Sequence, residues 1–111
     1  MVYKILPARL WEQACRAGVF VGSAVDIADG FIHFSTAAQV RETAAKHFAG
    51  QPDLMLVAIP AAALEQLAWE PSRGGALFPH LYAPLPTAQA SWARLLPLGQ
   101  DGRHLFPEDL V

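Results

Sequence analysis

The sequence has little cysteine and no long apolar run. Its 111 residues include one cysteine, Cys15, so it can form neither an intramolecular disulfide nor a thiolate metal cage. Cys15 falls within a helical pattern beside Trp11 and Ala14, which predicts a thiol in the core rather than a nucleophile. No apolar stretch follows a basic start or is long enough to span a bilayer. We therefore expect no signal peptide, no membrane partner and a cytoplasmic location.

Positive charge is also sparse. The eight Lys and Arg residues are scattered among ten Asp and Glu residues, and the formal net charge is −2. Binding of nucleic acid through bulk charge requires a cluster of cations, so we expect no such partner, whereas one nucleotide in a local site remains compatible with this charge. The four histidines form no His-x-His or His-x3-His pair, so no metal is expected.

The composition that is present is typical of one globular domain over residues 1–111, with 53% hydrophobic and 16% charged residues. Apolar periodicity and turn residues predict a succession of elements. These are a strand over 2–6, a helix over 7–18, a loop over 20–30, a strand over 31–35, a helix over 37–49, a strand over 54–59, a helical turn over 60–66, a strand over 67–70, extended segments over 81–85 and 92–98, and an irregular tail from 99. This order predicts a mixed α+β fold with two main helices.

The segment Asp29–Thr36 is the first candidate for chemistry. In a strand, alternate side chains share a face, so His33 and Ser35 point to the same side while their neighbours face the core. An ionisable imidazole beside a hydroxyl indicates a pocket wall. Thr36 and Gln39 match a capping box at the start of a helix, which accounts for both residues without catalysis.

The segment Phe78–Tyr82 is the second candidate. If it is extended, His80 and Tyr82 share a face while Leu81 faces the core, and the pair could bind a phosphate, stack on a base or relay a proton. The alternative is that Tyr82 packs and that His80 donates to a backbone carbonyl. Arg73 stands in the preceding Gly-rich loop, which either closes over a ligand or is merely flexible.

Charged residues that could support these histidines are Glu70, Asp26 and Asp29, any of which could be an acid partner. An Asp in a Gly-rich turn more often hydrogen-bonds its own backbone. Lys4 shares a strand face with apolar neighbours, so it either lines the pocket or points to solvent from an edge strand.

These motifs resemble a small bacterial family catalogued as domain of unknown function 952. The resemblance rests on Gly30-Phe31-Ile32-His33, on Phe78-Pro79-His80-Leu81-Tyr82 and on the opening Tyr3-Lys4-Ile5, and it covers nearly the whole chain. That family is similar in fold to ADP-ribosyltransferases and RNA 2′-phosphotransferases, which use NAD in a cleft between two small sheets. The resemblance therefore implies an ADP-ribosyltransferase-like, strongly bent mixed sheet, and NAD or ADP-ribose as a cofactor.

The sequence also departs from that superfamily. Lys4 stands where its first strand usually has a His or Arg, and His80 stands late, where a Glu is often found. These departures argue against Glu-dependent transfer to protein side chains. They leave NAD or ADP-ribose binding, or phosphate chemistry on a nucleotide.

Our leading hypothesis is an NAD- or nucleotide-using enzyme whose catalytic residues are His33 and His80. The residues expected to bind the cofactor are Lys4, Ser35, Glu70, Arg73 and Tyr82. One rival is a non-catalytic module that binds a small metabolite or a partner, and another is a metal-dependent hydrolase. The shared-site hypothesis requires His33 and His80 to face the same cleft. Nothing in the sequence indicates the oligomeric state.

Overall fold

Strands and α-helices alternate as far as residue 59, and only strands and short 3₁₀ turns follow, in the computed structural model. The structure describes residues 1–111 apart from the side chain of Arg73. Its elements are β1 (Val2–Pro7), α1 (Ala8–Ala17), β2 (Val19–Phe20), α2 (Ala24–Asp29), β3 (Ile32–His33), α3 (Val40–His47), β4 (Leu54–Ile59), β5 (Leu67–Pro71), β6 (Leu77–Leu81), β7 (Leu85–Pro86) and β8 (Trp92–Leu96), with short 3₁₀ turns at Ala61–Ala63, Arg73–Gly75 and Thr87–Gln89. The predicted mixed α+β class is confirmed.

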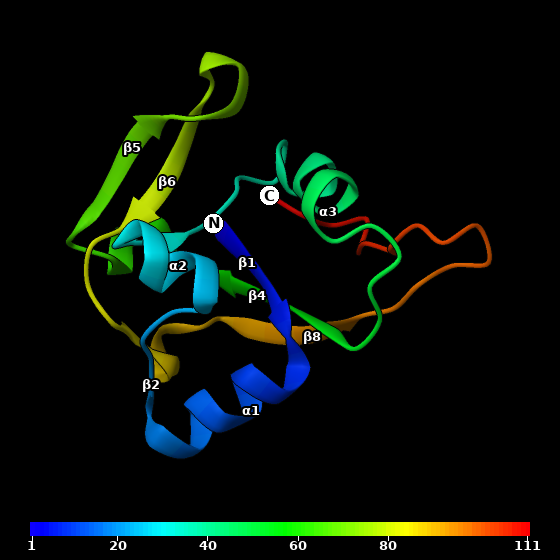
Figure 1. Ribbon diagram of the computed structural model, residues 1–111. Helices are drawn as coiled ribbons and strands as arrows, with labels where there is room; N and C mark the ends of the chain where they lie inside the picture. The colour runs from blue at the N-terminus through cyan, green and yellow to red at the C-terminus, as the bar shows by residue number, and fades with distance from the viewer.

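The strands form small antiparallel sheets. One has the order β1-β4-β8, another β3-β6-β5, and β2 pairs with β7. The apolar strand β4 lies at the centre of the first sheet, as predicted. The β5–β6 hairpin projects away from that sheet (Figure 1). Backbone hydrogen bonds of 2.8 and 2.9 Å between Tyr3 and Ser35 join the two three-stranded sheets.

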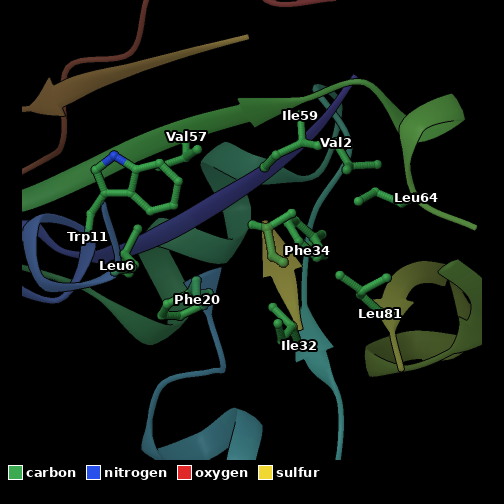
Figure 2. Packing of buried hydrophobic residues seen from close by; sticks show 12 residues of the cluster. Val2, Leu6, Trp11, Phe20, Ile32, Phe34, Val57, Ile59, Leu64 and Leu81 are labelled. Carbon is green, nitrogen blue, oxygen red and sulfur yellow. The ribbon is translucent and has the colours of Figure 1, made fainter. Parts of the chain in front are cut away.

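The core lies on both faces of the β1-β4-β8 sheet, because alternate side chains of β1 and β4 point to opposite sides. On one face, Val2 and Leu6 pack with Val57 and Ile59 and with residues of α1, β2 and β3 (Figure 2). On the other face, α3 packs against a second buried cluster, which comprises Tyr3, Ile5, Val40, Ala44, Leu54, Leu56, Ala58 and Leu96.

Helix α1 follows its sequence signals closely, with one exception. Gly18 ends the helix in the left-handed conformation at φ 83°, and its N–H donates to the carbonyl of Ala14. The prediction of a core thiol was wrong, because Cys15 is exposed. Trp11 and Ala14, three residues apart, face the sheet, and the next side chain points away from it.

The predicted loop over 20–30 was wrong in its centre, where α2 forms. Ser23 and Asp26 make a reciprocal capping box at its start, and Gly30 ends it at φ 87°. These are turn-type residues, but at this spacing they begin and end a helix of six residues.

Three further boundaries differ from the predictions. The strand expected over 31–35 is shortened to β3, and α3 begins only at Val40. Of the capping box expected before α3, only half is present, in which the Gln39 side chain accepts from the N–H of Thr36. The extended segment expected to begin at residue 81 begins at Leu77 and ends at Leu81.

None of the described helices combines the length and apolarity needed to cross a bilayer.

Candidate active site

Antiparallel pairing brings the two predicted histidines together. Strand β3 pairs with β6 so that His33 lies opposite His80. Their ring centroids are 5.5 Å apart, with an angle of 69° between the rings. Both rings line a cavity of about 470 Å³, whose walls come from β1, α2, the β3 region, α3 and β6. The two histidines therefore face the same cleft, as the shared-site hypothesis requires.

His33 is held by a carboxylate that is buried beneath it. Its Nδ1 donates to Oδ1 of Asp26 at 2.6 Å, and its backbone N–H donates to the same oxygen at 3.1 Å. Asp26 is 1% exposed. Asp26, one of the three candidate acid partners, therefore holds the first histidine.

Lys4 is the counter-charge of this carboxylate. Its Nζ lies 2.9 Å from Oδ1 of Asp26, and the residue is 5% exposed, so the alternative of a solvent-facing Lys4 is wrong. Burial would raise the pKa of Asp26, but the hydrogen bond from His33 and the charge of Lys4 outweigh it and hold that pKa well below its ordinary value. Burial lowers the pKa of Lys4, against the opposing effect of Asp26.

The second ring nitrogen of His33 meets another carboxylate. Its Nε2 lies 2.8 Å from Oδ2 of Asp29, the last residue of α2, whose side chain is 49% exposed. A carboxylate accepts hydrogen bonds only, so both contacts of the ring are hydrogen bonds at once when the ring carries two N–H groups. Asp29 also lines the cavity.

His80 is held by a carboxylate in a more exposed place. Its Nδ1 donates to Oε1 of Glu70 at 2.8 Å, and the hydroxyl of Tyr82 donates to the same oxygen at 2.7 Å. These hydrogen bonds, Tyr82 first, lower the pKa of Glu70, while the hydrogen bond to Glu70 raises the pKa of Tyr82. Phe31 stacks on the His80 ring at a centroid distance of 4.1 Å.

Ser35 completes the wall beside His33. It is buried, and its hydroxyl lies 2.9 Å from the hydroxyl of Thr43 on α3. Both residues line the cavity, as does His47, an exposed residue at the end of α3. This hydrogen bond links α3 to the segment that follows β3 at the cavity wall.

The structure gathers four of the predicted site residues at this cavity: Lys4, His33, Ser35 and His80. Glu70 and Tyr82 are not among its lining residues. Tyr82 instead lines a separate hollow of about 290 Å³ together with Phe31. Arg73, which was expected to bind the cofactor, lies outside what the structure describes at the level of side chains.

Sequence reasoning named Asp26 among three candidate acid partners but missed Phe31, which it treated only as a strand residue. Phe31 contacts the rings of both His33 and His80. The capping spacing of Ser23 and Asp26 was a usable signal for the start of the helix that carries Asp26. Among the described side chains, no group of three or more His, Cys, Asp or Glu residues has the geometry to hold a metal ion.

The chain also matches the model of a known protein family. A family model described as "Protein of unknown function (DUF952)" matches residues 5–93. The chain belongs to the DUF952 family. No curated protein matches it.

This DUF952 chain is also similar to solved structures of protein CC0527 from Caulobacter crescentus. A crystal structure of that protein is 51% identical, with a TM-score of 0.90 over 94% of this chain and 92% of that chain. A solution NMR structure is 52% identical, with a TM-score of 0.84 over 92% and 89% of the two chains. The two proteins therefore share the fold described above, while a likeness of this family to ADP-ribosyltransferases stays a prediction.

Proposed function

We propose that the chain is an enzyme that uses NAD or a related nucleotide, with His33 and His80 as its catalytic residues. The observation that carries this proposal is that two imidazoles, each held at Nδ1 by a carboxylate, face one cavity. Its volume of about 470 Å³ is in the range of small-ligand sites, roughly 300–1,000 Å³. Its position between two small sheets is also the place where the resemblance to NAD-using transferases expects a ligand.

In this function the two rings act in general acid–base catalysis or stabilise developing charge. Glu70 holds Nδ1 of His80 and leaves Nε2 as the nitrogen that can reach a ligand. Tyr82 acts through Glu70 rather than by stacking on a ligand in this cavity. Ser35 lines the wall with a hydroxyl that can bind a ribose.

The charges favour one part of a nucleotide over another. Lys4 is the one Lys or Arg among the described lining residues, and Asp26 already offsets its charge. An ammonium carries three N–H donors, so Lys4 can still donate to a neutral ligand oxygen. We therefore assign the ribose and base to this cavity and place the phosphates toward its mouth.

Calorimetric titration with NAD, ADP-ribose and nucleoside phosphates tests the proposal, followed by chromatography for released nicotinamide or phosphate. We expect at least one ligand to bind and to be turned over, and His80→Ala to abolish turnover with the fold intact. His104→Ala is the matched control, because His104 contacts the backbone of Gln51 and does not line the cavity. No heat with any of these ligands, in a folded protein, would exclude this function.

One observation favours a non-catalytic binding module as the second candidate. Both ring nitrogens of His33 already meet protein carboxylates, as a structural histidine would require. In that case His33→Ala lowers the free energy of unfolding by about 1 kcal/mol or more, and a ligand binds without turnover. Denaturant unfolding and the same chromatography separate the two candidates.

A further inference from the structure

The carboxylate of Asp26 is the most heavily bonded polar group of the site. Its Oδ1 accepts from Nζ of Lys4 at 2.9 Å and from the backbone N–H and Nδ1 of His33 at 3.1 and 2.6 Å. Its Oδ2 accepts from the N–H and the hydroxyl of Ser23 at 2.8 and 2.9 Å. Five donors thus converge on one fully buried side chain.

This arrangement holds His33 at two points. One oxygen accepts from both the backbone and the ring, so the position of the residue and the rotation of its ring are fixed together. Because an ionised carboxylate has no proton to donate, Nδ1 must carry an N–H, and Nε2 is the nitrogen turned toward Asp29 and the cavity.

Lys4 explains how such a carboxylate is tolerated in the core. An unpaired buried charge is strongly destabilising, and a hydrogen-bonded partner of opposite charge offsets part of that penalty. The hydrogen bond from His33 and the positive charge of Lys4 keep the pKa of Asp26 low despite its burial, so it remains an ionised acceptor.

We propose that Asp26 is the positioning residue of His33, which it fixes with Nδ1–H toward the core and Nε2 toward the cavity, and that Lys4 serves as the buried counter-charge of Asp26. Lys4 is then a support of the site rather than a phosphate ligand. Only the catalytic consequence rests on the proposed function, whereas the placement of the ring does not.

Proton and nitrogen NMR of the histidine side chains tests this placement without any substrate. In the parent protein we expect an Nδ1–H signal of His33 far downfield, because a short charge-assisted hydrogen bond deshields its proton. In Lys4→Met/Asp26→Leu both buried charges are removed together, which avoids an unpaired ion. We expect this downfield Nδ1–H signal of His33 to be lost.

Asp26→Asn supplies the same measurement if the double variant does not fold. The amide oxygen is a weaker acceptor than a carboxylate, so the Nδ1–H signal should move upfield. Glu70→Gln is the matched control, because it alters the carboxylate partner of His80 and should leave the His33 signal in place. An unprotonated Nδ1 in the parent, or an unchanged His33 signal in the folded Asp26 variants, would overturn the proposal.

A kinetic readout separates this inference from the proposed function. If NAD is turned over, Asp26→Asn should lower kcat at least tenfold with KM nearly unchanged, because the ring is mispositioned while the cavity wall persists. Absence of turnover in the parent would refute the proposed function and leave the NMR result to decide the role of Asp26. An unchanged kcat in Asp26→Asn, with turnover in the parent, would overturn the positioning role.

Discussion

The two cavity histidines are held by carboxylates in very different surroundings. The side chain of Asp26 is fully buried beside Lys4, whereas that of Glu70 is 38% exposed. Charges near solvent interact weakly, and buried ones interact strongly. Substitution at Asp26 should therefore disturb stability and geometry together, and substitution at Glu70 should act mainly on the local hydrogen bonds.

The titration of Tyr82 tests the exposed carboxylate. The hydrogen bond to Glu70 raises the pKa of Tyr82 above its ordinary value of 10.0, because ionisation would place a phenolate beside a carboxylate. We expect Glu70→Gln to lower that pKa, measured by the ultraviolet absorbance of tyrosinate. The chain has two tyrosines, so Tyr82→Phe identifies which transition belongs to this residue. A transition at the same pH in Glu70→Gln would contradict the contact.

At the residue scale, alternation along strands identified part of the cavity wall. His33 and Ser35 were expected on one face, and the structure places both at the cavity, with Lys4 and His80. Alternation does not reveal which carboxylate approaches a ring from another element. Asp26 reaches His33 only because a short helix turns it inward, and that requires the tertiary arrangement.

Helix α2 shows why one element was not predicted. Six residues make fewer than two turns, so hydrophobic periodicity has too few positions to register. Asp and Gly are also typical of loops, and their capping roles are distinguished only by spacing. By contrast, β4 was predicted with the same bounds that the structure shows, because its continuous apolar run is bounded by Pro52-Asp53 and Pro60.

Ser23→Ala tests the start of α2. The Ser23 hydroxyl takes part in the capping box and donates to Asp26, so its loss should lower the free energy of unfolding by about 1 kcal/mol, as for other N-caps. Denaturant unfolding measures this change. Ser91→Ala, at an exposed position, should change stability by less than about 0.5 kcal/mol. Equal effects of the two substitutions would contradict the capping role.

Leu56→Ala tests the central strand β4. Leu56 is wholly buried in the cluster beneath α3, so removing it should cost about 2–5 kcal/mol. Leu95→Ala is the matched control, because Leu95 is 68% exposed on the neighbouring strand β8. We expect the control to lose far less stability in the same unfolding measurement. A loss at Leu56 as small as that at Leu95 would show that β4 is not central.

At the scale of the whole molecule, the site exists only where separate sheets meet. β1 contributes Lys4 from one sheet, and β3 and β6 contribute the two histidines from another. The backbone bridge between Tyr3 and Ser35 holds these sheets together at the cavity. No local pattern predicts such long-range pairing, which is why the sequence could nominate His33 and His80 but not establish that they meet.

The dependence of global stability on pH follows from the buried pair at this junction. Because the pKa of Asp26 is lower in the folded chain than its ordinary 3.8, its ionisation stabilises the fold fully above that value, and the contribution is lost as pH falls toward the folded pKa. We expect the free energy of unfolding of the parent, measured by denaturant, to fall as the pH decreases below about 4.

Lys4→Met/Asp26→Leu should weaken this acid dependence, because it removes the titrating carboxylate together with its counter-charge. Glu42→Gln is the matched control, since Glu42 pairs with Lys46 on the exposed face of α3, where solvent screens the interaction. The free energy of unfolding of this control should fall with decreasing pH almost as steeply as that of the parent. If the free energy of unfolding depends on pH in the same way in the parent and the double variant, Asp26 is not ionised in the core. That result would also contradict the positioning of His33 by a charged acceptor.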